Sequence, residues 1–138
     1  MQIHGQCHCG AIRFTALIDP DKVFACHCSD CQLISGGPFR AVVPVPVEQV
    51  QMQGTARHYV KVAASGNRRA QAFCGDCGTQ LYATEADTPR VMNLRLGCVA
   101  ERAQLPPRVQ VWRSSAMPWL PDLDAAPAHT CGRDSPLA

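Results

Sequence analysis

The sequence of 138 residues predicts an all-β fold in a single domain. Short apolar runs with a period of two residues recur along the chain, and this period is typical of half-buried strands. Glycine, proline and asparagine separate the runs and indicate turns. No segment has the apolar spacing of a long amphipathic helix. The length is sufficient for one domain with its own hydrophobic core.

The clearest strand follows Gly10, where two sets of side chains alternate. One face would carry Ile12, Phe14, Ala16 and Ile18, and the other Arg13, Thr15 and Leu17. Further strands are expected over residues 40–47, 47–53, 57–62, 69–73, 80–84, 91–96 and 108–112. Within the valine-rich run 40–47, Pro44 and Pro46 favour a sheet edge or a bulge, because proline cannot donate to a ladder.

One short helix is expected between residues 29 and 37. Ser29 would cap its start with Gln32 as the capping-box partner, and the pair Gly36-Gly37 would end it. Cys31 would then lie in the first turn, where free backbone N–H groups and the helix dipole stabilise a thiolate. A simple turn is the alternative.

From Met117 onward the chain is rich in proline and alanine, which predicts an irregular tail packed at Trp119. We therefore expect one domain over residues 1–120 and a tail over 121–138. The net charge is +2, and no basic run exceeds the pair Arg68-Arg69. Nucleic-acid binding by charge alone is therefore not expected, because it requires a clustered basic face.

Residues 1–10 lack the apolar core of a signal peptide, and no apolar stretch reaches the roughly 18 residues that span a membrane. We therefore expect a soluble cytoplasmic protein, in which the nine cysteines stay reduced. Clustered thiols in that compartment bind metal more often than they form disulfides. A disulfide scaffold, the alternative, would leave one thiol unpaired.

Seven cysteines fall into three groups. Two of the groups are pairs that together supply four metal ligands, and the third supplies three. Cys7 and Cys9 together with Cys74 and Cys77 form two knuckles that end in glycine, and these complete a structural zinc site. The group Cys26-x-Cys28-x-x-Cys31 supplies three ligands and leaves one coordination position open. The sequence thus predicts two zinc ions per chain, one structural and one catalytic.

Three thiolates around Zn²⁺ give a net charge of about −1, which weakens the ion as a Lewis acid toward water. Such a site favours a fourth sulfur ligand and lowers the pKa of an incoming thiol. The expected chemistry is therefore thiol activation toward an aldehyde carbonyl, with Cys26, Cys28 and Cys31 as the catalytic metal ligands.

Several alternatives stay open. The triplet would be a second structural site if Cys98, His27 or another histidine supplied a fourth ligand, and an iron–sulfur cluster is also conceivable. His8 and His27 are expected to point away from the metals, and Cys98 to be a buried inert thiol. His129 and Cys131 in the tail would bind metal only incidentally. Trp112 and Trp119 would be core aromatics or the rim of a pocket.

At these residues the sequence resembles the glutathione-dependent formaldehyde-activating enzyme family, which is related to the centromere-protein-V type domain. The resemblance covers about residues 5–120. It rests on Gly5-x-Cys7-x-Cys9-Gly10, Cys26-His27-Cys28-Ser29-Asp30-Cys31, Ser35-Gly36-Gly37-Pro38-Phe39, Phe73-Cys74-x-x-Cys77-Gly78 and Pro118-Trp119.

The resemblance implies an Mss4-like fold (β-tent) stapled by a structural zinc on Cys7, Cys9, Cys74 and Cys77, with a catalytic zinc on the triplet. It also implies a carbon–sulfur lyase that joins glutathione to formaldehyde. Two features depart from the family pattern: Gln71 stands where an arginine is common, and Gly97-Cys98-Val99-Ala100-Glu101 replaces a Gly-Thr-Leu-Asp-Asp run.

A zinc enzyme acting on a small thiol and an aldehyde is therefore the leading hypothesis, and residues 35–39 and Trp119 would line its pocket. A non-catalytic zinc-stabilised β-domain that binds a ligand or a protein is the alternative, and a redox or metal-buffering protein is a weaker one. The sequence leaves the oligomeric state undetermined, as monomer or homo-oligomer.

Overall fold

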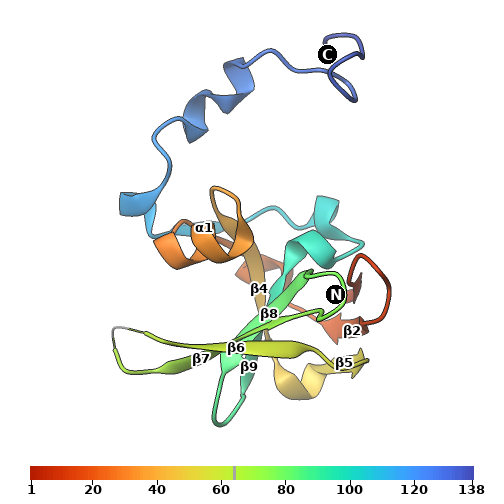
Figure 1. Cartoon of the computed structure of the whole chain (residues 1–138), viewed down its shortest axis with the longest axis vertical. Coiled ribbons are helices and arrows are strands. Elements are labelled where there is room, and N and C mark those ends of the chain that lie inside the picture. Colours follow the sequence, from red (N-terminus) through yellow and green to blue (C-terminus); the bar gives the residue numbers. More distant parts are fainter. Residues whose placement is uncertain (64) are drawn as a thin grey trace.

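The computed structural model describes residues 1–63 and 65–138, and its strands form two sheets (Figure 1). The smaller sheet is antiparallel, in the order β1 (Gln2–Gln6), β2 (Arg13–Leu17) and β5 (Val50–Gln53). The larger sheet has the order β10 (Val109–Val111), β3 (Phe24–Cys26), β4 (Arg40–Pro46), β9 (Val91–Arg95), β8 (Gln80–Glu85), β7 (Arg68–Phe73) and β6 (Arg57–Val62). The mostly-β architecture confirms the predicted fold class.

One α-helix, α1 (Ser29–Ser35), is found in the described ranges. Four short 3₁₀ turns lie between strands: η1 (Pro20–Lys22), η2 (Val47–Gln49), η3 (Leu96–Cys98) and η4 (Arg102–Gln104). Two more, η5 (Arg113–Ser115) and η6 (Leu120–Ala125), follow the last strand β10. None of the helices that the structure describes has the length and hydropathy needed to cross a membrane.

The hydrophobic core lies between the two sheets. The predicted alternation in β2 is confirmed, because Ile12, Phe14, Ala16 and Ile18 are all buried. From the large sheet, Val43 and Val45 of β4 and Leu94 of β9 pack against them. Since neighbouring residues of a strand point to opposite faces, this core uses only one face of the large sheet.

The second face of the large sheet is polar near its middle. Cys26 is paired with Arg40, and Val42 with Arg95, so all four side chains share the face opposite Val43 and Leu94. Gln71 of β7 lies on this same face, because its neighbour Ala72 joins the core. The helix α1 lies on this side of the sheet (Figure 1). The fold therefore separates an apolar face that stabilises from a polar face that is available for chemistry.

Most expected strands are confirmed within two residues, and β6 matches its expected limits. Residues 47–53 differ, because η2 occupies the start of that run and β5 only its end. The strands β1 and β3 had no sequence signal: β1 buries fully only Ile3, and β3 has three residues.

The expectation of an edge position for residues 40–47 is wrong for the strand as a whole, since β4 lies between β3 and β9. The physical reason is that β3 pairs only with Arg40–Val42. The half of β4 that contains Pro44 and Pro46 is hydrogen-bonded on the β9 side alone. Each proline therefore occupies a local edge inside an internal strand.

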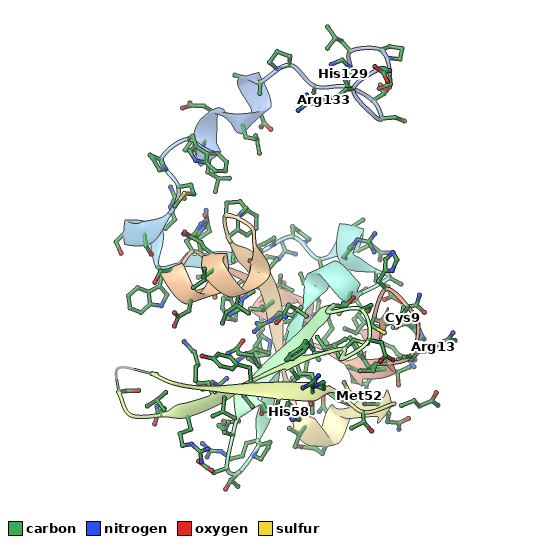
Figure 2. All side chains as sticks on the ribbon, viewed as in Figure 1. Cys9, Arg13, Met52, His58, His129 and Arg133 are labelled. Carbon is green, nitrogen blue, oxygen red and sulfur yellow. The ribbon has the colours of Figure 1, made fainter. Side chains whose placement is uncertain are left out.

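Residues after Met117 extend away from the sheets, and Figure 2 shows His129 and Arg133 far from Cys9 and Arg13. Trp112 is 64% exposed and Trp119 49%, so neither is a core aromatic. Trp119 is about half covered, and nearly all residues that follow Leu120 are exposed.

Glu85 at the end of β8 gives a test of the fold. Its carboxylate accepts hydrogen bonds from the backbone N–H groups of Arg90 (3.1 Å) and Val91 (3.3 Å), and these lower the pKa of Glu85 to about 2. Because the folded pKa lies below the ordinary value of 4.5, the stabilisation is complete above that pH and is lost as the pH falls toward 2.

We expect Glu85→Gln to lower the free energy of unfolding by about 1 kcal/mol at pH 7, since a charged acceptor is lost. The difference from the wild type should shrink as the pH falls below about 4.5, as measured by urea unfolding at a series of pH values. Glu48→Gln, on an exposed residue, is the control. A difference that does not depend on pH would contradict the assigned hydrogen bonds.

Candidate metal centres

The first centre joins two distant knuckles. The sulfur atoms of Cys7, Cys9, Cys74 and Cys77 all lie within 4.8 Å of one another. The Sγ–Sγ distance is 3.6 Å between Cys7 and Cys9 and 3.7 Å between Cys9 and Cys74. A tetrahedron with metal–sulfur bonds of about 2.3 Å has edges of about 3.8 Å. The donor set therefore fits a tetrahedral zinc site.

Backbone and hydroxyl donors surround these sulfur atoms. The N–H of Ile12 donates to Cys7 Sγ at 3.2 Å, and Thr79 Oγ1 lies 3.2 Å from Cys77 Sγ. Hydrogen bonds from the hydroxyl and the N–H of Thr79 lower the pKa of Cys77 to about 5. Such bonds favour the thiolate, which is the form that binds a metal.

The second centre lies at the junction of β3 and α1 on the polar face of the large sheet. The sulfur atoms of Cys26, Cys28 and Cys31 also lie within 4.8 Å of one another. Neither Cys98 nor His27 belongs to this group of candidate ligands in the described ranges. Burial raises the pKa of Cys26 to about 12, so this thiol needs a nearby cation, such as a bound metal ion, to ionise.

The helix start differs from the expected capping box. Cys28, not Ser29, is the N-cap residue, and its Sγ accepts from the N–H of Cys31 at 3.3 Å. Gly36 ends the helix with a φ of 71°, as expected for a glycine in the left-handed region. Ser29 loses the capping role because Cys28 has the extended backbone of a cap residue and its sulfur accepts from the N–H of Cys31.

The expected capping-box residue Gln32 has another function. Its Nε2 donates to the carbonyl of His27 at 2.8 Å and to that of Ser115 at 2.9 Å. Ser115 Oγ donates to the carbonyl of His27 at 3.0 Å. Trp112 has a φ of 58°, a left-handed conformation that is costly for this residue type, where the chain turns into η5. The loop of the three cysteines is thus held from the C-terminal end of the domain.

The histidines between the ligands behave as expected. His27 is 1% exposed, and its Nε2 lies 2.8 Å from Gln110 Oε1, while its ring packs at 5.4 Å from that of Phe39. His8 is exposed at the surface. Cys98 Sγ donates to the carbonyl of Arg95, and burial raises the pKa of Cys98 to about 11, in agreement with an inert thiol. His129 and Cys131 are exposed in the tail.

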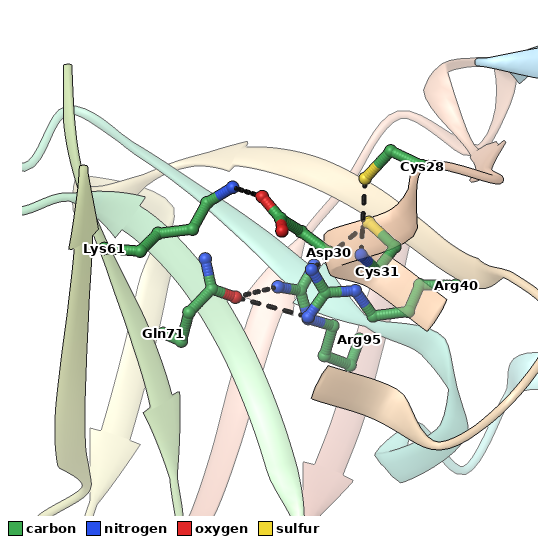
Figure 3. A network of polar contacts seen from close by, with 7 residues as sticks. All are labelled: Cys28, Asp30, Cys31, Arg40, Lys61, Gln71 and Arg95. Carbon is green, nitrogen blue, oxygen red and sulfur yellow. Dashed lines mark hydrogen bonds and ion pairs between the residues drawn. The ribbon is translucent and has the colours of Figure 1, made fainter. Parts of the chain in front are cut away.

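A cationic cluster that the sequence analysis missed lies beside the second centre (Figure 3). Arg40 donates to Cys31 Sγ at 3.2 Å and to Gln71 Oε1 at 3.2 Å, and Arg95 donates to the same oxygen at 2.9 Å. Burial, together with the charge of Arg40, lowers the pKa of Arg95 to about 10. The available signal was a single charged residue in each of two expected strands, Arg40 in residues 40–47 and Arg95 in residues 91–96.

An ion pair spans this cluster. Lys61 on β6 contacts Asp30 in the first turn of α1, as Figure 3 shows. The pair connects the edge strand of the large sheet to the helix that carries Cys31. Asp30 therefore has a partner of its own and is not the N-cap of the helix.

A pocket of about 490 Å³ borders the cluster on another side. It is lined by both arginines and by Ser35 and Phe39, two of the residues expected there, together with residues of the second knuckle and η3. Trp119 is not among its lining residues.

Comparison with known proteins identifies the relatives of this chain. The family model described as glutathione-dependent formaldehyde-activating enzyme matches residues 2–115. The chain belongs to this family. Its match includes the seven clustered cysteines, so both candidate metal centres lie inside the family region.

Two curated relatives support membership of the formaldehyde-activating family. An uncharacterized lyase of Schizosaccharomyces pombe is 32% identical over 81 residues, which are 59% of this chain and 56% of that protein. The aligned part of the chain thus spans little more than half of this relative. A protein of Halomonas elongata, provisionally named a glutathione-dependent formaldehyde-activating enzyme, is 23% identical over 126 residues, or 87% of this chain and 80% of that protein.

The fold is also found in a crystal structure of a Rhodobacter sphaeroides protein. The TM-score is 0.60 at 15% sequence identity, and the match covers 78% of this chain and 99% of the other. At this identity the similarity shows a shared fold.

Replacing Gln32 tests the support of the second centre. We expect Gln32→Ala to lower the free energy of unfolding by about 1–2 kcal/mol, because the carbonyls of His27 and Ser115 each lose a donor. Thermal unfolding measures this change. Leu33→Ala, on the neighbouring helical residue that is 83% exposed, is the control and should change stability by less than about 0.5 kcal/mol. Equal effects of the two substitutions would contradict the role of Gln32.

Proposed function

We propose that this chain is a zinc-dependent enzyme of the carbon–sulfur lyase type, which adds a small thiol such as glutathione to an aldehyde such as formaldehyde. The observation that carries the proposal is the second cluster, in which three cysteine sulfurs converge without a fourth protein ligand in the described ranges. The family model and the names of the relatives support the substrate class.

The proposed structural zinc has Cys7, Cys9, Cys74 and Cys77 as ligands. The proposed catalytic zinc has Cys26, Cys28 and Cys31, which makes two ions per chain. When bound at three thiolates, zinc supplies a site at which a further thiol binds as thiolate, with a pKa below its usual value. The geometry fits this metal in both places, since every donor is a cysteine sulfur.

The residues around the triplet have complementary tasks. Arg40 donates to Cys31 Sγ and balances part of the negative charge of three thiolates. The N–H of Cys31 stabilises the sulfur of Cys28. The bonds from Gln32 and Ser115 to the carbonyl of His27 fix the loop on which all three ligands lie. Together they hold the ligand atoms in place before a substrate arrives.

Two further proposals concern the whole chain. We propose a domain over residues 1–120 and a separate tail over 121–138, since most tail residues are exposed. We also propose a cytoplasmic location, where all nine cysteines, which are free thiols in the structure, would stay reduced. No nucleic acid or membrane is proposed as a partner.

Metal stoichiometry and two substitutions test the proposal. The purified protein should contain two zinc ions per chain by elemental mass spectrometry, and it should accelerate the addition of glutathione to formaldehyde. Cys31→Ser should retain one zinc and the fold, while the rate falls by about 100-fold or more, because the metal ligand set is broken.

Cys77→Ser should instead lower the free energy of unfolding by several kcal/mol, roughly the scale of a lost structural zinc ligand. Cys131→Ser, which removes an exposed thiol of the tail, is the control and should change neither property. A single zinc per chain, with no thiol addition by the wild type, would contradict the proposed enzymatic activity. It would favour the alternative of a zinc-stabilised binding domain.

A further inference from the structure

Two buried cations on the polar face have no acidic partner. Arg40 and Arg95 are each 7% exposed. None of the ion pairs between described residues includes either of them. Their acceptors are Cys31 Sγ and the amide oxygen of Gln71, which is neutral and is shared by both guanidinium groups (Figure 3). A buried charge without a charged partner is costly, so this arrangement needs a compensating group.

The metal centre offsets only part of this charge. Three thiolates and a divalent zinc sum to about −1, whereas the two guanidinium groups contribute +2. Arg40 already donates to Cys31, and Lys61 is paired with Asp30. Before a substrate thiolate binds, a net positive charge of about +1 therefore remains at the cluster, and Arg95 is the cation without an anionic acceptor in the described part of the chain.

The structure also provides space for an anion beside these groups. The pocket of about 490 Å³ has a volume typical of small-molecule sites and is lined by both arginines. The Nε atoms of Arg40 and Arg95 are buried without an acceptor among the described residues, and so is Gln80 Oε1 without a donor. Gln80 lines the same pocket. The polar groups around the pocket are therefore not all paired within the described part of the chain.

We propose that this pocket is an acid-binding subsite, in which Arg95 and Arg40 hold a carboxylate of the thiol substrate. The inference rests on the proposed function, because it assigns the residues that would hold the thiol which the three-cysteine centre receives. A planar guanidinium matches a carboxylate in geometry as well as in charge. Arg95 would provide most of the selectivity, while Arg40 links the subsite to Cys31.

Gln71 provides a sharp test, because its oxygen already accepts from both arginines. Gln71→Glu keeps the size and both hydrogen bonds but adds the missing negative charge within the protein. The internal carboxylate should then compete with the carboxylate of the ligand. Arg95→Gln makes the complementary change, since it removes the cation and leaves the amide of Gln71 in place.

The experiment measures equilibrium binding by calorimetry, with zinc-loaded protein and two probes that have no free thiol. The probes are S-methylglutathione and its diamide, in which both carboxylates are replaced. We expect the wild type to bind the acid at least about tenfold more tightly than the diamide, the factor expected for one charge-assisted hydrogen-bonded pair. Arg95→Gln and Gln71→Glu should each reduce this preference to less than about threefold.

Arg68→Gln is the control, since it removes an equal charge at an exposed surface pair with Asp87 and should leave the preference unchanged. Thermal unfolding and zinc content establish that each variant is folded, and the comparison of the two probes on the wild type needs no variant. Equal affinity of the wild type for acid and diamide, including undetectable binding of both, would overturn the inference. An undiminished preference in a folded Gln71→Glu variant would do the same.

A neutral thiol separates this inference from the proposed function. Suppose that 2-mercaptoethanol adds to formaldehyde on the enzyme while acid and diamide bind equally. The acid-binding subsite is then contradicted, and the proposed enzymatic activity is supported. If the acid is preferred and no thiol adds to an aldehyde, the anion-binding pocket stands as a binding site and the proposed enzyme does not.

Discussion

The convergence of four sulfur atoms from two distant segments is the constraint on which the rest of the structure depends. Cys9 and Cys74 are separated by 65 residues in sequence, and their sulfur atoms lie 3.7 Å apart. This contact joins the loop between β1 and β2 of the small sheet to the turn between β7 and β8 of the large one. It therefore closes one end of the hydrophobic core, where Cys7 and Cys74 are both buried. A metal at this point would stabilise the packing of one sheet on the other.

With the sheets joined, the large sheet has two faces of different character. The face with Val43 and Leu94 is fully used by the core, and it accounts for stability. The opposite face brings Cys26, Arg40 and Arg95 together under α1. Charged groups are tolerated there because they have polar acceptors and a thiolate cluster beside them, whereas the apolar face offers neither. The candidate chemistry is thus confined to the face that the core does not require.

The electrostatic balance of that face connects the two proposals. Three thiolates require positive charge, which a zinc ion and Arg40 would supply. The positive charge of Arg95 is more than the three thiolates require, and the neutral side chain of Gln71 does not balance it. The amide oxygen of Gln71 accepts hydrogen bonds from both arginines. The positive charge on this face is therefore carried by Arg40 of β4 and Arg95 of β9.

The sequence by itself determined the strand positions with clear alternation, the grouping of the cysteines as four plus three, and the helix that ends at Gly36. These depend on local spacing, which a sequence displays directly. Tertiary structure alone decided which face of β4 is polar, how prolines fit inside an internal strand, and that Cys28 caps α1. It also placed Arg40 and Arg95 on one amide oxygen. Those outcomes depend on strand pairing and register, which join residues with no relation in sequence, and their energies come from burial that only the folded chain creates.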